Sequence, residues 1–221
     1  MRTLVPFEAA RPKTRLDPFL DDDERAAFAR SMLRDVIGAV ERAGHDPEVV
    51  ATAPLELSSA SVSVPVAVDD RPLSAAVNAR LDGVDANDPV AVLVSDLGLV
   101  TPAAVCRLVD AEGADADADA GVAIAPGRGG GTNGLVVSHP EFRVDFHGTS
   151  YRDHRRTARA VGASVRVVDS MRLSTDVDEP EDLVEVLLHG EGAAAAWLRS
   201  AGVGLGGGDG GRVEVTRSGE G

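Results

Sequence analysis

A strongly apolar run, PVAVLVSD at residues 89–96, narrows the folds open to this chain more than any other feature. Its apolar residues do not alternate with polar ones, and this is the pattern of a strand buried on both faces of a parallel sheet. Other short apolar runs recur along the chain and are predicted to be strands. They lie at residues 2–7, 48–53, 61–69, 121–126, 134–139 and 164–169.

Helical patterns separate most of these runs. They cover residues 21–44, 72–82, 102–111, 150–163 and 178–190, and the first of them opens on acidic residues that suit a helix N-terminus. Strands that alternate with helices over short connections predict an α/β fold, a single-domain αβα sandwich around a mostly parallel, mixed sheet. We expect one domain over residues 1–202 and a flexible, glycine-rich tail over residues 203–221.

The charge balance limits the partners of the chain. The formal net charge is −14, from 36 acidic and 22 basic residues, and the acidic excess is spread along the sequence. Such a surface opposes non-specific binding to nucleic acid or to an anionic membrane, and it resembles the proteins of high-salt cytoplasms. No 18-residue apolar stretch or signal peptide is present, so we expect a cytoplasmic protein. The single cysteine, Cys106, excludes an intramolecular disulfide.

In α/β folds, ligands bind at the carboxyl ends of the strands, so the loops there are the first candidates for a site. The loop after the first predicted strand carries RPKTRL, residues 11–16. Lys13 in this loop is the only lysine, whereas the other 21 basic residues are arginines. A compact ammonium is therefore a plausible requirement at this position, and Lys13 with Arg15 could bind a phosphate chain. The alternative is a solvated turn.

Carboxylates follow two other predicted strands. Asp96 stands where the apolar run 89–96 enters a loop, and an aspartate at such a place holds Mg²⁺ or serves as a turn residue or N-cap. Asp176 and Asp178 are two residues apart in an extended segment, so their side chains share one face. Together with Asp96 they could complete a Mg²⁺ site.

Two further loops could bind an anion. The loop 127–134, GRGGGTNG, offers backbone N–H groups with Thr132 and Asn133 beside them, although a flexible hairpin explains its glycines equally well. It is neither a Walker A loop nor a dinucleotide fingerprint. Ser150 stands at the N-terminus of a predicted helix, with Gly148 before it, and this N-terminus suits phosphate or carboxylate, whereas ordinary N-capping is the alternative. His154, one turn further, could donate to the same anion.

In order, these loops resemble those of the 2-phospho-L-lactate guanylyltransferases, enzymes of coenzyme F420 biosynthesis. The matching pieces are VPFEAARPKTRL, LVSDLGLVTP, APGRGGGTNGLVV, FHGTSYRDH and TDVDEPEDL, within residues 4–185. The resemblance implies a GT-A-like, Rossmann-like nucleotidyltransferase fold and a homodimer. Relatives often carry a lysine where this chain has Glu8.

The resemblance also implies a reaction: GTP and (2S)-2-phospholactate, or phosphoenolpyruvate in some relatives, give a diphosphate-linked guanosine product and pyrophosphate. It implies that Lys13 and Arg15 hold the triphosphate and that Asp96, with Asp176 or Asp178, binds Mg²⁺. Lys13, Arg15 and Asp96 would then be the catalytic residues. By the same pattern, the acceptor is bound by Thr132, Asn133, Gly148 and Ser150.

The sequence also allows three other functions to be considered. Another nucleotidyltransferase of the same fold, for molybdenum cofactor or a sugar 1-phosphate, normally has glycines directly after the first strand, and FEAARPK has none. A non-catalytic nucleotide-binding regulator would not need the cations and all three aspartates. An NAD-dependent oxidoreductase needs a strand–GxGxxG–helix unit, which the sequence lacks.

Overall fold

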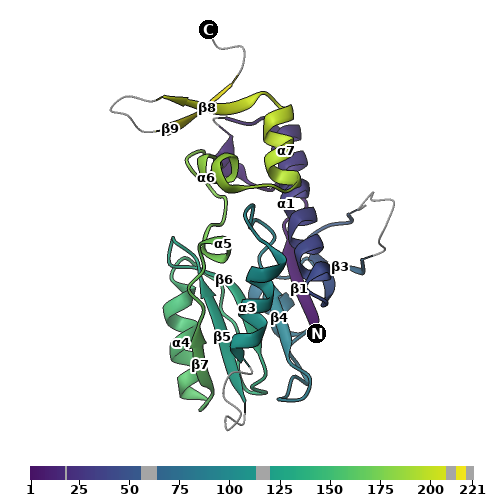
Figure 1. Cartoon of the computed structure of the whole chain (residues 1–221). Coiled ribbons are helices and arrows are strands. Elements are labelled where there is room, and N and C mark those ends of the chain that lie inside the picture. Colours follow the sequence, from purple (N-terminus) through teal and green to yellow (C-terminus); the bar gives the residue numbers. More distant parts are fainter. Residues whose placement is uncertain (18, 56–63, 113–119, 208–212, 218–221) are drawn as a thin grey trace.

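The computed structural model describes residues 1–17, 19–55, 64–112, 120–207 and 213–217. Within these residues, seven strands form one sheet in the order β3-β2-β1-β4-β6-β5-β7 (Figure 1). Of the seven, β6 runs antiparallel to both of its neighbours, and the other strand pairs are parallel. The predicted mixed, mostly parallel sheet is confirmed. Its strands are β1 (Arg2–Phe7), β2 (Asp46–Ala51), β3 (Val66–Val68), β4 (Val90–Leu93), β5 (Gly121–Pro126), β6 (Thr132–Val137) and β7 (Ser164–Val167).

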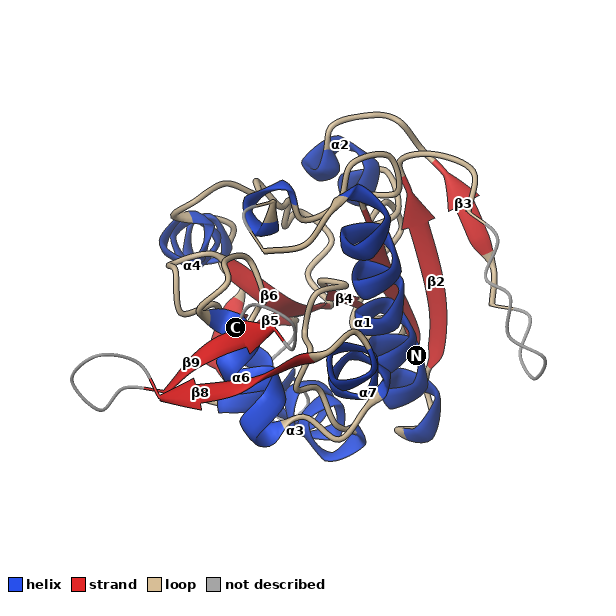
Figure 2. Cartoon of the chain, turned by 90° about the horizontal axis from the view of Figure 1, so that it is seen from above, coloured by secondary structure: helices blue, strands red, loops and turns tan. Residues whose placement is uncertain are grey.

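Helices cover both faces of this sheet, as Figure 2 shows from above. One face packs on α1, α3 and α5, and the other packs on α2 and α4. Successive residues of β1 point to opposite cores, Leu4 to the second and Val5 to the first, and both are fully buried. The helices are α1 (Asp22–Arg42), α2 (Leu73–Asn78), α3 (Pro102–Glu112), α4 (Ser150–Ala160), α5 (Met171–Ser174), α6 (Asp182–His189) and α7 (Ala193–Ser200).

The longest helix, α1, begins and ends where its sequence predicts. The Asp21 carboxylate accepts from the Glu24 backbone N–H, and the Glu24 side chain accepts from the Asp21 backbone N–H, which is a complete capping box. Past its C-terminus, Gly44 adopts a positive φ of 83°, a conformation that favours glycine. A third apolar core, around Phe28 and Met32, joins α1 to α6 and α7.

The chain end differs from the flexible tail expected over residues 203–221. Strands β8 (Val203–Gly207) and β9 (Val213–Arg217) pair as an antiparallel hairpin, while residues 208–212 and 218–221 lie outside the described part. Glycine fits β8 because a Cβ on Gly206 would stand 2.5 Å from Thr216 Cγ2. Arg217 fastens β9 to the Glu24 carboxylate of α1. The alternating VEVTR segment, residues 213–217, therefore pairs with β8, which the glycine content of the region did not indicate.

Several element boundaries also differ from the expected ones. Strand β6 begins at Thr132, two residues before the predicted start, and α6 begins at Asp182, four residues later than predicted. Of the strand expected over residues 61–69, residues 66–68 form β3 and residues 61–63 lie outside the described residues. No helix in the described ranges is long and apolar enough to cross a membrane.

The start of α7 is capped from another helix. Its N-cap position is Gly192, and Asp35 of α1 accepts from the N–H groups of Ala193 and Ala194 at 2.6 and 2.8 Å. We predict that Asp35→Ala lowers the free energy of unfolding by about 1–2 kcal/mol, the usual value of such a cap. Arg34→Ala removes an exposed neighbour and is expected to change stability by less than about 0.5 kcal/mol. Urea denaturation of both variants measures this, and equal stabilities would contradict it.

Candidate active site

Three loops meet at the carboxyl edge of the sheet through one ammonium group. Lys13 Nζ, from the loop after β1, lies 2.5 Å from Asp96 Oδ2 in the loop after β4. It also lies 3.0 Å from Asp178 Oδ1 in the segment after α5. A backbone hydrogen bond of 3.1 Å from Val177 N–H to Asp96 O ties the two aspartate segments together. The structure thus brings together Lys13, Asp96 and Asp178, which are up to 165 residues apart in sequence.

The backbone at Lys13 is held in an unfavourable conformation. Its φ and ψ are 54° and 42°, and it is the only non-glycine residue with positive φ in the described ranges. This left-handed conformation costs roughly 1–2 kcal/mol for an L-residue with a Cβ. A short 3₁₀ helix at Thr14–Leu16 follows, and its Leu16 is fully buried and anchors the loop in the third core. The anchored loop therefore holds the ammonium at the sheet edge in spite of this conformational cost.

Burial and the neighbouring carboxylates have opposite effects on the pKa of Lys13. Burial acts to lower the pKa of Lys13, but the carboxylates of Asp96 and Asp178 outweigh it, so the pKa is raised and the ammonium stays charged. Burial raises the pKa of Asp176, and the nearby charges of Asp96 and Asp178 add to this effect against a hydrogen bond from Asn133. Three carboxylates therefore share one region with a single buried cation.

The fit of this region to a divalent cation is partial. Asp96 Oδ1 is buried without a hydrogen-bond partner, an oxygen that a hard cation could satisfy. Yet within the described residues no group of three His, Cys, Asp or Glu side chains is placed to hold a metal ion. Lys13 bridges two of the three predicted ligands. The metal role of Asp96, Asp176 and Asp178 thus remains a prediction, with two carboxylates and substrate oxygens as the ligand set that suits Mg²⁺.

Arg15 lies at the rim of the same site. Its side chain is 68% exposed, and its Nη1 stands 3.5 Å from Asp178 Oδ2. A solvated pair at this distance contributes little to stability. Arg15 is therefore able to turn towards an incoming anion without breaking a strong contact.

The second group of predicted residues lies beside the first, on β6 and α4. Asn133 Nδ2 donates to Asp176 Oδ1 at 3.0 Å, which orients that carboxylate. Thr132 and Ser150 are both buried, and the Ser150 hydroxyl donates to Thr132 Oγ1 at 3.3 Å. Ser150 does not cap its own helix, because the start of α4 has no side-chain cap. Gly148 is exposed, and its carbonyl oxygen faces Gly130 in the glycine-rich loop.

Two acidic residues that were not assigned to the site shape its loops. Glu8 Oε1 accepts from Ala10 N–H and Thr52 Oγ1–H, both at 2.8 Å, so it folds the lysine loop back on itself. Burial acts to raise the pKa of Glu8, but these hydrogen bonds outweigh it and lower the pKa. Asp182 Oδ2 accepts from the backbone N–H groups of Asp178 and Glu179 at 2.9 Å and fixes the turn before α6. Their partners are distant or backbone groups, which sequence spacing does not reveal.

A cleft of about 610 Å³ opens next to Asp96. It lies between the ends of β1 and β4 and the start of α2, and both apolar and polar side chains line it. This volume is typical of a small-molecule site. Its lining also includes four carboxylates and one guanidinium, and among the lining residues are Phe7, Glu8, Val50, Thr52, Asp69, Asp70, Arg71, Leu73, Ser95 and Asp96.

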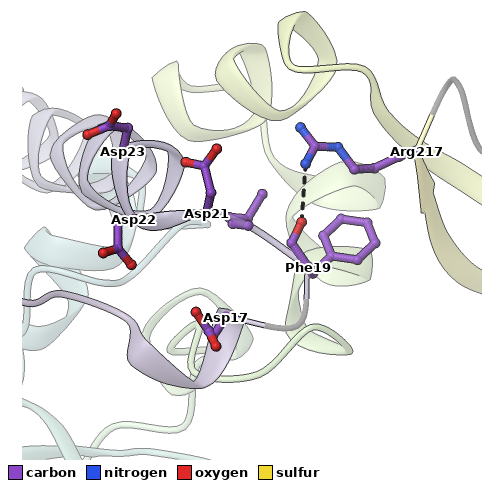
Figure 3. Close-up of a pocket in the computed structure, with 7 residues that line it drawn as sticks. Asp17, Phe19, Asp21, Asp22, Asp23 and Arg217 are labelled. Carbon is purple, nitrogen blue, oxygen red and sulfur yellow. Dashed lines mark hydrogen bonds between the residues drawn. The ribbon is translucent and has the colours of Figure 1, made fainter.

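A larger cavity of about 820 Å³ lies away from the lysine centre, between the start of α1 and the chain-end hairpin (Figure 3). Its charged lining is four carboxylates and one guanidinium, and that guanidinium already binds the Phe19 carbonyl oxygen at 3.3 Å. None of the residues predicted for the site lines this cavity, whereas Asp96 lines the smaller cleft, so size alone does not make the larger cavity the nucleotide site. The charged residues are Asp17, Asp21, Asp22, Asp23 and Arg217.

The fold has counterparts among solved nucleotidyltransferases. A protein of Desulfovibrio desulfuricans G20 assigned as a nucleotide-diphospho-sugar transferase superposes with a TM-score of 0.69 at 18% identity, over 90% of this chain and 94% of its own. A CMP:2-keto-3-deoxy-manno-octonic acid synthetase solved with CTP gives 0.51 at 13% identity, over 83% and 95%. The chain therefore has the α/β fold of this class of transferases.

Sequence comparison identifies the family. Residues 1–218 match the family described as guanylyl transferase CofC like, and the chain belongs to it. The 2-phospho-L-lactate guanylyltransferase of Halomicrobium mukohataei is 58% identical over 98% of this chain and all of its own length. The enzyme of that name from Haloferax volcanii is 57% identical over 98% of both. The chain is thus a nucleotidyltransferase, and its haloarchaeal relatives fit the acidic composition that resembles proteins of high-salt cytoplasms.

The lysine bridge leads to a pH-dependent prediction. Lys13→Met keeps the length of the side chain but leaves the aspartates without a counter-charge, so we expect a loss of about 1.5–3 kcal/mol at pH 8 and low salt. Burial and the neighbouring carboxylates already raise the pKa of Asp176, and loss of the ammonium is expected to raise it further, so protonation of Asp176 relieves the repulsion and the loss shrinks as the pH falls towards 5.

Arg15→Met is the matched control, because it removes a more exposed cation from the same Asp178 carboxylate. It should cost less than about 1 kcal/mol. Denaturant titrations of both variants at pH 8 and pH 5 measure the effect. A loss for Lys13→Met that is independent of pH would contradict the role of the ammonium.

Proposed function

We propose that this chain transfers GMP from GTP to (2S)-2-phospholactate, which forms lactyl-2-diphospho-5′-guanosine and pyrophosphate for coenzyme F420. A phosphate oxygen of the acceptor attacks the α-phosphorus, and the bond between that phosphorus and the α–β bridging oxygen breaks. Its electrons leave with pyrophosphate. The observation that carries the proposal is the ammonium of Lys13 at the strand edge, bonded to Asp96 and Asp178 beside a cleft of nucleoside size.

The cations would bind the triphosphate. A lysine ammonium has three donors, and within the described residues only Asp96 and Asp178 accept from Lys13, so one donor remains for a phosphate oxygen. Arg15 at the rim would hold the outer phosphates. Both groups would neutralise charge on the leaving pyrophosphate, which is the main requirement of phosphoryl transfer.

Asp96, with Asp176 or Asp178, would hold Mg²⁺. Bound there, the cation supplies charge neutralisation across the phosphate oxygens. The supporting observations are the unpartnered Asp96 Oδ1 and the raised pKa of Asp176, which burial and the neighbouring carboxylates cause. Asn133 keeps Asp176 turned towards this region.

The acceptor would bind on the other side of the carboxylates. Thr132 and Ser150 supply hydroxyl groups, and the chain near Gly148 supplies a backbone N–H at the start of α4. This position next to Asn133 and Asp176 would bring the acceptor phosphate within reach of the α-phosphorus.

A pyrophosphate-release assay tests the function directly. The enzyme is incubated with Mg²⁺ and GTP, ATP or CTP, with 2-phospholactate or phosphoenolpyruvate as acceptor. We expect release with GTP and 2-phospholactate well above every other pairing. Binding of GTP without release for either acceptor would refute the proposal and favour a regulatory nucleotide-binding protein.

The identity of the cation gives a second prediction. Lys13→Arg keeps the charge, but the planar guanidinium is too large for the space between the two carboxylates. The Lys13 side chain there is only 12% exposed. We expect turnover to fall about 10–100-fold with a retained fold. The control is Arg11→Lys, the reverse change at an exposed position of the same loop, with turnover within about two-fold of the wild type. Wild-type turnover of Lys13→Arg would show that any cation suffices.

A further inference from the structure

His154 is a buried histidine in contact with the acceptor side of the site. It lies on α4 with 1% of its surface exposed. The rings of Phe142 and Phe146 pack edge-on against it, at centroid distances of 6.0 and 5.2 Å. Both ring nitrogens have a partner: Nδ1 lies 2.9 Å from Thr132 Oγ1, and Nε2 accepts from the Asp145 backbone N–H at 2.9 Å.

These two contacts settle the protonation of the ring. Nε2 accepts a hydrogen bond from a backbone N–H, so it carries no proton. A neutral imidazole has one N–H, which must then be on Nδ1. The contact at 2.9 Å is therefore a hydrogen bond in which His154 Nδ1–H donates and Thr132 Oγ1 accepts.

The direction of this bond determines what Thr132 can do. Its oxygen accepts from His154 Nδ1–H, and Ser150 Oγ lies 3.3 Å from the same oxygen. The Thr132 hydroxyl proton cannot point at His154, so it points either to Ser150 or to a bound partner. When the Ser150 hydroxyl donates to Thr132, the Thr132 proton is left for that bound partner.

We propose that His154 is a positioning residue that holds the Thr132 hydroxyl as a hydrogen-bond donor to the phosphate or carboxylate of the acceptor. This inference rests on the proposed function, because it assigns the acceptor to Thr132. His154 itself touches neither substrate in this account. It acts by filling a lone pair of Thr132 from a ring that two phenylalanines and the Asp145 N–H hold in place.

The environment of His154 keeps its ring neutral at neutral pH. Burial lowers the pKa of His154 to about 4. The charge of His147 lowers the pKa further, and the charges of Asp145 and Asp153 raise it. A protonated ring would turn Nε2–H against the Asp145 N–H. The direction of the bond to Thr132 is therefore constant at neutral pH.

Steady-state kinetics of His154 variants test the role. His154→Phe keeps the ring but removes the donor, so we expect the KM for 2-phospholactate to rise about ten-fold or more, with the KM for GTP within two-fold. His154→Asn can place its amide near the Nδ1 position and should restore most of the loss. An acceptor KM within two-fold of the wild type for a folded His154→Phe would overturn the proposal.

A double-mutant cycle with Thr132→Val separates positioning from loss of structure. If His154 acts through the Thr132 hydroxyl, His154→Phe should change the acceptor KM by less than two-fold when Thr132→Val is already present. Full additivity of the two effects would contradict the proposal. If His154→Phe fails to fold, as thermal denaturation would show, the comparison is made with His154→Gln, whose amide cannot take the Nδ1 position.

A spectroscopic measurement keeps this inference distinct from the proposed function. Long-range ¹H–¹⁵N NMR of the histidine rings in the whole enzyme reports which ring nitrogen is protonated, whether or not the enzyme turns over. We expect His154 with a proton on Nδ1 alone at pH 7. A proton on Nε2 would refute the inference, whereas a wild-type enzyme that does not release pyrophosphate would refute the function.

Discussion

The site depends on the ammonium of Lys13, held between Asp96 and Asp178. Without a cation there, three carboxylates would face one another at a sheet edge, and burial already raises the pKa of Asp176. The ammonium joins loops that three separate strand–helix units supply. The chain carries a net charge of −14, and its single lysine lies between two carboxylates, one of which lines the cleft. A left-handed backbone at Lys13 is the conformational cost of this placement.

The antiparallel strand β6 brings the second half of the site to the first. Its reversed direction puts Thr132 and Asn133, at its start, beside the carboxyl end of β4. Asn133 contacts the carboxylates, while Thr132 contacts α4 through Ser150 and His154. Adjacent residues of one strand point to opposite sides. The carboxylate cluster and the pair of Thr132 with Ser150 are thus linked through neighbouring residues of β6.

The sequence predicted the strands of the sheet, five of the helices and the loops that meet at the sheet edge, but not α5 or α7. Strong local patterns made this possible, such as the apolar run at β4 and the capping box of α1. Long-range pairing could not be predicted, because it depends on the fold. The hairpin of β8 and β9 was mistaken for a tail, since Gly206 reads as flexible until Thr216 packs against it. The partner of His154 was missed because Thr132 was assigned to a loop.

Crystals grown with Mn²⁺ and a non-hydrolysable GTP analogue would show whether Lys13 binds the triphosphate and the aspartates bind the divalent cation. The anomalous signal of manganese locates the cation, and the density locates Lys13 Nζ. We expect one peak within coordination distance of Asp96 and of Asp176 or Asp178, with Lys13 donating to a phosphate oxygen. A peak in the acidic cavity of Figure 3, among Asp21–Asp23, with Lys13 still bonded only to Asp96 and Asp178, would contradict it.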